Sequence, residues 1–248
     1  MNSSRLDLAD IDYKGSGFLF RAESDLKRYN KWIVNSFLSN IDCTTLHDAA
    51  ILDFGAGIGT LSQIFMERTG IRPDTVEIDH IQREILVSRG FKAHSSLEST
   101  AQRYRLIFTS NVLEHIEDDV ATLKSLHDHL DENGVLAIYV PAFKLLWSSL
   151  DDQVGHYRRY RIGDLTDKLN QAGFQVSTAK YCDSLGFVLA ILFKFIGSKD
   201  GEPTSMALSI FDRYLLPISK AGDFLCSRFA GKNVLVIARP ISRPGQII

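Results

Sequence analysis

Short apolar runs alternate with amphipathic stretches along most of the chain. Each run is too short for a helix, and the stretch after it places apolar residues at three- and four-residue steps. This alternation of strand and helix patterns is typical of a mostly parallel sheet with helices on both faces. The expected strands are 50–54, 75–78, 91–94, 106–109, 135–140, 174–181 and 234–239. We therefore predict an α/β fold built on a doubly wound, seven-stranded, Rossmann-like sheet.

The helical pattern begins near the N-terminus. Apolar residues recur at helical steps over 23–41, which predicts an amphipathic helix, whereas Gly15 and Gly17 predict no regular element in 1–22. Asn133-Gly134 is expected to form a turn, and Gly173 to cap a helix. The other expected helices cover 60–68, the stretch up to Arg89, 118–130 and 162–172.

Residues 182–230 do not follow the alternation. We predict two apolar helices inserted before the last strand, with Pro217 bending the second. The insertion is expected to cap the core or to close a substrate pocket; a peripheral membrane or dimer contact is a further alternative. The whole chain, 1–248, is interpreted as one domain.

Composition excludes several classes of function. With 45% apolar and 23% charged residues, the chain has ample material for a core, and a net charge of −2 argues against a nucleic-acid binder. Three scattered cysteines form no CxxC pair, there is no signal-peptide core, and no apolar run reaches the length of a membrane span. We expect a cytoplasmic protein.

The stretch around Asp53-Phe54-Gly55-Ala56-Gly57-Ile58-Gly59 carries the first chemical signal. It reads as a strand, a tight turn and the start of a helix, a layout that brings a ligand against backbone amides. Glycines allow close approach because they have no Cβ. A carboxylate at Asp53 would repel a pyrophosphate but favour an ammonium or sulfonium group.

Four segments together resemble the class I S-adenosylmethionine-dependent methyltransferases. They are the Asp53–Gly59 turn, Glu77, the Ser110-Asn111-Val112-Leu113-Glu114-His115-Ile116 segment and Leu130–Gly134, within roughly 50–181. The resemblance implies S-adenosylmethionine as cofactor and S-adenosylhomocysteine as product. It also identifies 53–59 as the methyl-donor site.

The resemblance implies a role for each cofactor residue. Asp53 would lie near the methionine amino group, and Gly55, Ala56, Gly57 and Gly59 would pass their backbone under the methionine and ribose. Glu77 would accept from the ribose hydroxyls, with Asp79 as the alternative. The remaining assignments are Ile78 on adenine, Ser96 at the adenine edge, and Asn111 at the methionine end.

Methyl transfer to a hydroxyl needs a base, and His156 and His115 are the candidates, in that order. For His115, packing or capping at a helix start is the alternative. Some ubiquinone-pathway O-methyltransferases resemble this segment but carry an extra acidic residue that helps bind a metal. Asn111 departs from that pattern, so we expect no required metal.

The segment Asp151-Asp152-Gln153-Val154-Gly155-His156-Tyr157-Arg158-Arg159-Tyr160 is the most distinctive outside the cofactor site. Tyr157, Arg158, Arg159 and Tyr160 could bind a carboxylate, phosphate or planar acceptor. Equally, Asp–Arg pairs and tyrosine packing could pin the segment as a structural loop. A similar GHYRRY element occurs in a subgroup of methyltransferases found with polysaccharide and lipid-linked sugar enzymes.

We therefore expect an S-adenosylmethionine-dependent methyltransferase that acts on an oxygen of a small or lipid-like acceptor, a hydroxyl or a carboxylate. The alternatives are an N-methyltransferase, a non-catalytic S-adenosylmethionine-binding regulator and an NAD-dependent oxidoreductase. The expected partners are the acceptor and, as an open alternative, a membrane surface, but not nucleic acid.

Overall fold

The computed structural model describes residues 16–47, 49–196 and 204–241. They form a seven-stranded sheet in the order β3-β2-β1-β4-β5-β7-β6. Neighbouring strands from β3 to β5 are parallel, and β7 runs antiparallel to both β5 and β6. The strands are β1 Ile51–Phe54, β2 Asp74–Val76, β3 Ala93–His94, β4 Tyr104–Ser110, β5 Leu130–Pro141, β6 Phe174–Cys182 and β7 Asn233–Pro240. The predicted fold class is confirmed.

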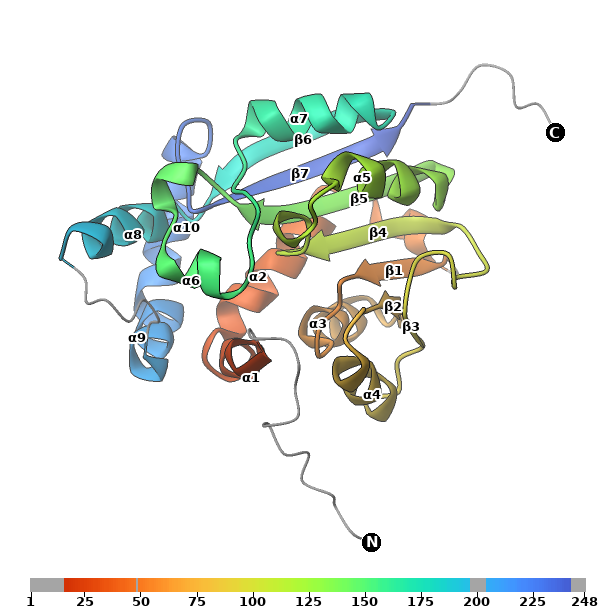
Figure 1. Cartoon of the computed structure of the whole chain (residues 1–248), viewed down its shortest axis with the longest axis horizontal. Coiled ribbons are helices and arrows are strands. Elements are labelled where there is room, and N and C mark those ends of the chain that lie inside the picture. The colour runs from red at the N-terminus through yellow and green to blue at the C-terminus, as the bar shows by residue number, and fades with distance from the viewer. Residues whose placement is uncertain (1–15, 48, 197–203, 242–248) are drawn as a thin grey trace, which may run out of the picture.

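Helices cover both faces of this sheet (Figure 1). Successive side chains of a strand point to opposite faces of the sheet, and apolar residues occupy both faces because both are buried. Leu52, Ile107 and Leu136 face the core shared with α5 and α7, whereas Ile51, Leu106 and Phe108 face the core shared with α2 and α3. The helices are α1 Ser16–Asp25, α2 Lys27–Leu38, α3 Thr60–Thr69, α4 His80–Ser88, α5 Asp119–Asp128, α6 Ser149–Gln153, α7 Ile162–Gln171, α8 Ser184–Ile196, α9 Ser205–Ile210 and α10 Leu216–Cys226.

The N-terminal region differs from the prediction of one helix over 23–41. Two helices are present, α1 and α2, and they meet at Leu26, whose backbone is not helical. The expectation of no regular element in 1–22 is wrong for residues 16–22, which belong to α1. Residues 1–15, including Gly15, lie outside the described residues.

The expected turn at Asn133-Gly134 is part of β5 instead. Tyr104 of β4 pairs with Leu130, and the next pair along the two strands is Leu106 with Val135. The extra residues of β5 between these pairs form a bulge. A bulge lets a strand continue past extra residues without ending the ladder. Gly173 follows α7 with φ of 90°, which agrees with its predicted role at the helix end.

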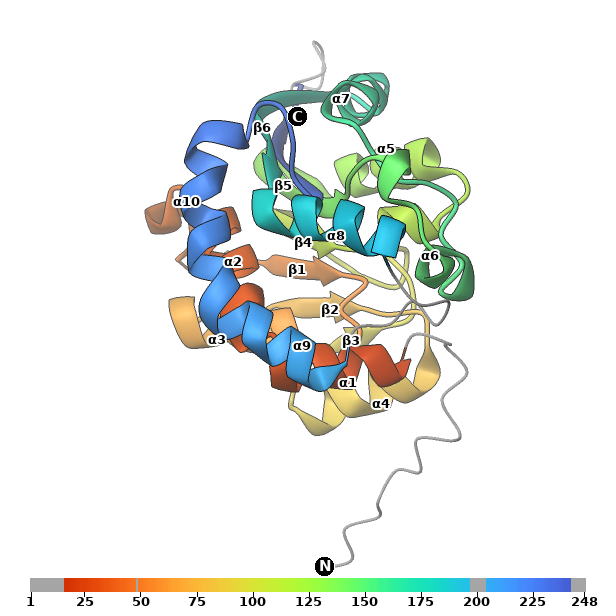
Figure 2. The same ribbon diagram turned by 90° about the vertical axis from the view of Figure 1, so that its left-hand side faces the viewer.

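The insertion begins where β6 ends and returns where β7 begins, so both of its ends lie at the carboxyl edge of the parallel strands. Figure 1 shows α8, α9 and α10 beyond the arrowheads of β1 and β4. A π-helical segment, Phe211–Leu215, joins α9 to α10, whose second residue is Pro217. Proline lacks the N–H of a regular helical turn, which explains the wider turn and the change of direction in Figure 2.

Candidate functional site

The turn after β1 is held by backbone contacts with β2. The N–H groups of Gly55 and Ala56 donate to the carbonyl oxygen of Val76, at 2.8 and 3.1 Å. Gly55, Gly57 and Gly59 have φ of 74°, 58° and 86°. These left-handed conformations suit glycine and disfavour any residue with a Cβ.

The three glycines differ in what a Cβ at each position would contact. A Cβ on Gly55 would lie 2.3 Å from Val112, and one on Gly59 would lie 2.8 Å from Leu86, so the chain itself excludes larger residues there. At Gly57 the nearest atom, in Leu19, would be 3.4 Å away, an ordinary contact. Of the three, only Gly57 could take a Cβ without crowding a neighbour, so the contacts of the chain itself do not account for a glycine there.

Asp53 is buried at the end of β1 and connects that strand to α3. Its carboxylate accepts a 2.6 Å hydrogen bond from the hydroxyl of Ser62, which is also buried. Burial raises the pKa of Asp53 to about 7, although the bond from Ser62 opposes the shift. The carboxylate therefore holds the first turn of α3 against the strand that leads into the glycine turn.

Glu77 directly follows β2 and reaches back to the glycine turn. Its two oxygens accept from the N–H groups of Gly57, at 2.8 Å, and Asp79, at 3.0 Å. Burial raises the pKa of Glu77 despite these bonds. The side chain of Asp79 is engaged elsewhere, since it caps α4 by accepting from the N–H of Gln82 at 2.9 Å. Beside them Ile78 is 86% exposed.

Two further predicted cofactor residues lie at other strand ends. Asn111 follows β4 with φ of 54°, and its side-chain amide donates to the Ser110 hydroxyl at 3.2 Å. It is exposed. Ser96 follows β3 in a turn in which the hydroxyl of Ser99 donates to the Ser96 carbonyl oxygen at 2.7 Å.

Sequence reasoning missed α1 as a cover of the glycine turn. Glu23 forms a two-pronged ion pair with Arg89 at the end of α4, at 2.6 and 2.9 Å, and accepts from the hydroxyl of Thr60 at the start of α3. The bonds from Arg89 lower the pKa of Glu23. Leu19 of α1 packs beside Gly57 and against a cluster that includes Ile58. The apolar Phe18-Leu19-Phe20 run was the available signal.

His156 is oriented by a carboxylate. Its Nδ1 lies 2.7 Å from Oδ1 of Asp151, which also binds the guanidinium of Arg159 through two contacts of 2.7 and 3.0 Å. Burial opposes ionisation of Asp151, but the bonds from His156 and Arg159 hold its pKa well below the usual range. Because a carboxylate accepts, Nδ1 carries the proton, and in the neutral ring Nε2 presents its lone pair.

His115 packs against His156. The ring centroids are 4.5 Å apart and nearly perpendicular, and Nδ1 of His115 lies 3.1 Å from the carbonyl oxygen of Val154. A carbonyl can only accept, so this Nδ1 also carries the proton. Burial, and then the neighbouring His156, lower the pKa of His115 to about 4, so the ring is neutral at pH 7.

Glu114 is the third member of this cluster. It is fully buried, and within the described part of the chain neither of its oxygens has a hydrogen-bond partner. Burial raises its pKa to about 8. Its Oε1 lies 3.9 Å from Nε2 of His156. Ligand atoms of Glu114, His115 and His156 all lie within 4.8 Å of one another, so these are the residues that could hold a metal ion.

Most of the GHYRRY side chains have partners inside the protein. Arg158 pairs with Asp119 at 2.7 Å, and Arg159 with Asp151 as described. Tyr160 is buried, and its hydroxyl donates to Asp119 at 2.9 Å. These contacts fit the pinned-loop interpretation for Arg158, Arg159 and Tyr160. Tyr157, 54% exposed, is the member that faces solvent.

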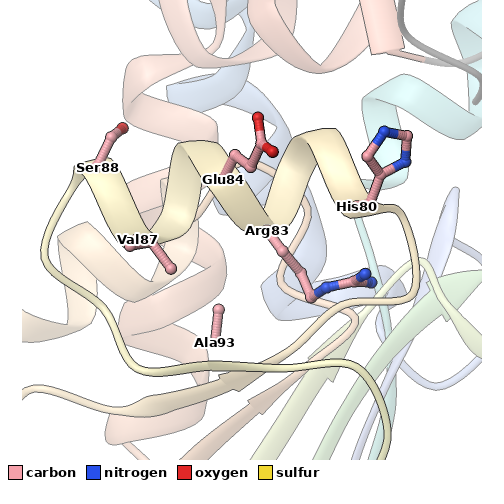
Figure 3. A pocket seen from close by; sticks show the side chains of 6 residues that line it. All are labelled: His80, Arg83, Glu84, Val87, Ser88 and Ala93. Carbon is pink, nitrogen blue, oxygen red and sulfur yellow. The ribbon is translucent and has the colours of Figure 1, made fainter.

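A hollow of about 470 Å³ lies against α4, and neither His115 nor His156 lines it. Figure 3 shows Arg83 and Val87 of α4 on the side of the helix that faces Ala93 of β3, with Glu84 on the other side. Arg83 also donates to the carbonyl oxygens of Glu77 and Ile78. The hollow therefore adjoins the end of β2, but none of the predicted site residues lines it.

Comparisons with known proteins agree with this architecture. Residues 27–179 match the model of a family described as a methyltransferase domain. No curated protein sequence matches the chain.

Solved structures share the fold at low sequence identity. A complex between the Haloferax volcanii Trm112 methyltransferase activator and a putative methyltransferase matches with 12% identity, TM-score 0.60, and coverage of 94% of this chain and 99% of that chain. A SAM-dependent methyltransferase from Archaeoglobus fulgidus matches with 16% identity, TM-score 0.57, and coverage of 90% and 99%. A possible histamine N-methyltransferase from Thermotoga maritima matches with 13% identity, TM-score 0.57, and coverage of 92% and 98%.

The family match spans more than half of the chain and includes the glycine turn, Glu77 and the histidine cluster. The protein belongs to the methyltransferase domain family.

Proposed function

We propose that this protein is an S-adenosylmethionine-dependent methyltransferase whose acceptor atom is an oxygen of a small or lipid-like molecule. The observation that carries the cofactor assignment is the position of Glu77. Its buried carboxylate stands at the end of β2, 2.8 Å from the N–H of Gly57, so an acid and a glycine turn meet where neighbouring parallel strands end. Ligands of doubly wound sheets bind at this edge.

In this proposal each cofactor contact has a named residue. Glu77 accepts from the ribose hydroxyls, and the ribose and methionine pass beside the backbone of Gly57. Asp53 acts on the methionine amino group through water, because its side chain is buried against Ser62. The exposed Ile78 packs on adenine. Gly55, Ala56 and Gly59 shape the turn, Ser96 contacts the adenine edge and Asn111 the methionine end, whereas the capping role of Asp79 makes it the weaker ribose candidate.

Fold-level similarity supports this choice of cofactor. Coclaurine N-methyltransferase and magnesium protoporphyrin IX methyltransferase, both solved with bound S-adenosylhomocysteine, share the fold at TM-scores of 0.56 and 0.51. The family match removes the reason to consider a nicotinamide-dependent oxidoreductase.

The Asp151–His156 pair supports an acceptor that needs a base, such as a hydroxyl. When bound, the cofactor supplies an electrophilic methyl group; the chain must align the hydroxyl and take its proton. Nε2 of His156 receives that proton, while Asp151 keeps the ring in the right tautomer and stabilises the imidazolium that forms. His115 is the second candidate, but its low pKa makes it a weak base. Tyr157 is placed to contact the acceptor.

Nitrogen methylation is the second candidate function. Both mitomycin 7-O-methyltransferase and coclaurine N-methyltransferase share the fold. An amine acceptor must likewise lose a proton, so the histidine pair alone does not separate the two. A carboxylate acceptor needs no base, and a non-catalytic regulator would bind the cofactor without turnover.

The test is a mass-spectrometric screen of hydroxyl, carboxylate and amine acceptors, including lipid-linked sugars, with S-adenosylmethionine as donor. The enzyme proposal predicts a product 14 mass units heavier, about one CH₂ group. His156→Gln should then lower kcat by about 10²–10⁴-fold, the usual contribution of a general base. Unchanged turnover in both His156→Gln and His115→Gln would remove histidine base catalysis from the account.

A further inference from the structure

The outer face of the insertion carries a continuous line of exposed apolar side chains. Along α9, the π-helical segment and α10, and at Phe229 just after α10, they recur at four- and seven-residue steps, the spacing of neighbours on one side of a helix. We call this set the apolar stripe: Met206, Ile210, Tyr214, Ile218, Leu225 and Phe229, each between 47% and 77% exposed. Soluble surfaces carry single exposed apolar residues, but a line of this length marks an interaction site.

Helix α8 extends the same face. It packs against α10, and Figure 2 shows α8, α9 and α10 together on the side facing the viewer. Val188, Leu192 and Phe193 of α8 are 48%, 48% and 68% exposed. No helix in the described residues is long and apolar enough to cross a membrane. The exposed apolar residues thus lie on α8 as well as on α9 and α10.

The acidic and basic side chains of 204–229 differ in exposure. The acids point inward: Asp212 accepts from two N–H groups at the start of α2, and Asp223 accepts from the N–H groups of Asp183 and Ser184. Arg213, Lys220 and Arg228 are all exposed, and the Lys220 ammonium lies 5.7 Å from the centre of the Trp32 ring on α2. Between 204 and 229 the exposed charges are thus basic, although the whole chain has a net charge of −2.

The apolar stripe and the exposed cations together indicate which partner binds this face. A second copy of the chain, docked stripe to stripe, would bring its own Arg213, Lys220 and Arg228 toward these cations, with no exposed acid in residues 204–229 of either copy to pair with them. An anionic surface pairs with the cations and accepts the apolar side chains at the same time. We propose that the α8–α10 face docks the protein on a lipid bilayer that contains anionic lipids.

Docking of this kind would place the bilayer beside the candidate site. The insertion leaves and rejoins the sheet at its carboxyl edge, α9 packs on α1, and α1 covers Gly57. Lys194 of α8 donates to the carbonyl oxygen of Leu145, in the segment after β5 that leads to His156. If the proposed function holds, the acceptor is a lipid-linked hydroxyl that is reached from the membrane surface.

Vesicle flotation tests the docking without any methyl transfer. Wild-type protein should float with vesicles of phosphatidylcholine and phosphatidylglycerol, much less with phosphatidylcholine alone, and less at high salt. The triple variant Met206→Gln, Leu225→Gln and Phe229→Gln should lose binding by about tenfold or more, since each buried apolar side chain contributes strongly to partitioning. Val87→Gln on α4, 60% exposed in the wild type, is the matched control and should float normally.

Other outcomes overturn the proposal. They are absence of flotation with anionic vesicles, equal flotation of the triple variant, or wild-type dimerisation that the triple substitution abolishes while vesicles are not bound. Circular dichroism and S-adenosylhomocysteine binding are measured on every variant. A triple variant that no longer floats but still binds S-adenosylhomocysteine supports the membrane face. A wild type that floats but does not bind S-adenosylhomocysteine contradicts the proposed function and leaves the docking proposal standing.

Discussion

Replacing Gly57 by alanine separates the cost of backbone strain from the loss of ligand space. Gly57 has φ of 58°, and a Cβ there meets no atom of the described chain closer than 3.4 Å. The substitution should therefore cost only the left-handed strain of a non-glycine residue, about 1–2 kcal/mol. Cofactor affinity should fall further, because the proposal has the ribose and methionine approach this backbone.

Gly70→Ala is the matched control. Gly70 has φ of 75° at the end of α3, and no atom lies within 4 Å of the position a Cβ would take. Urea denaturation should give both variants the same loss of about 1–2 kcal/mol. Gly55→Ala should lose more, about 2–5 kcal/mol, because its Cβ would lie 2.3 Å from Val112 and overpacking adds to the strain.

Titration calorimetry with S-adenosylhomocysteine then gives the decisive comparison. Gly70→Ala should keep the wild-type Kd, and Gly57→Ala should weaken it by about tenfold or more, equivalent to about 1.4 kcal/mol. Equal Kd values in the two variants would refute the claim that the cofactor approaches Gly57.

Three further outcomes are expected. Asp151→Asn should reduce kcat and shift the acid limb of the pH–rate profile, because the amide cannot stabilise a His156 imidazolium; an unshifted profile would show that Asp151 only holds Arg159. Glu114→Gln should gain stability over the wild type as pH rises from about 5 to 8, by about 3–4 kcal/mol in denaturation experiments. The reason is that the unfolded carboxyl ionises near its ordinary pKa while burial raises the folded pKa to about 8, so a pH-independent difference would contradict that environment. Dialysis against EDTA should leave turnover unchanged; a loss that added Mg²⁺ or Zn²⁺ restores would instead give the Glu114–His115–His156 cluster a metal.

Local patterns predicted the sheet well, because the central strands β1, β4, β5 and β7 contain short apolar runs bounded by polar or glycine residues. They failed where tertiary contacts decide. The pattern gave no boundary at Leu26 and no reason for α1, which is held to the glycine turn by Glu23 and Arg89, 66 residues apart. At Asn133-Gly134 the turn signal was real, but pairing with β4 absorbed it as a bulge.

The sequence named candidate site residues but gave little about their contacts. That His115 and His156 lie together follows from both being at the carboxyl edge of the sheet. The partners of Arg158 and Arg159 lie on α5 and α6, and sequence spacing could not choose between those acids and an acceptor. The complete burial of Glu114 was likewise hidden, since a polar side chain after a strand is exposed more often than not.

The central claim is that Glu77 and the glycine turn bind the methyl donor. Calorimetric titration of the wild type with S-adenosylhomocysteine should show one site, and Glu77→Gln should weaken binding by about tenfold or more, because an amide accepts poorly from two ribose hydroxyls. Glu67→Gln, the same chemical change at an exposed position of α3, should leave Kd unchanged. A wild type that does not bind, or a Glu77→Gln variant that binds as tightly as Glu67→Gln, would contradict the account.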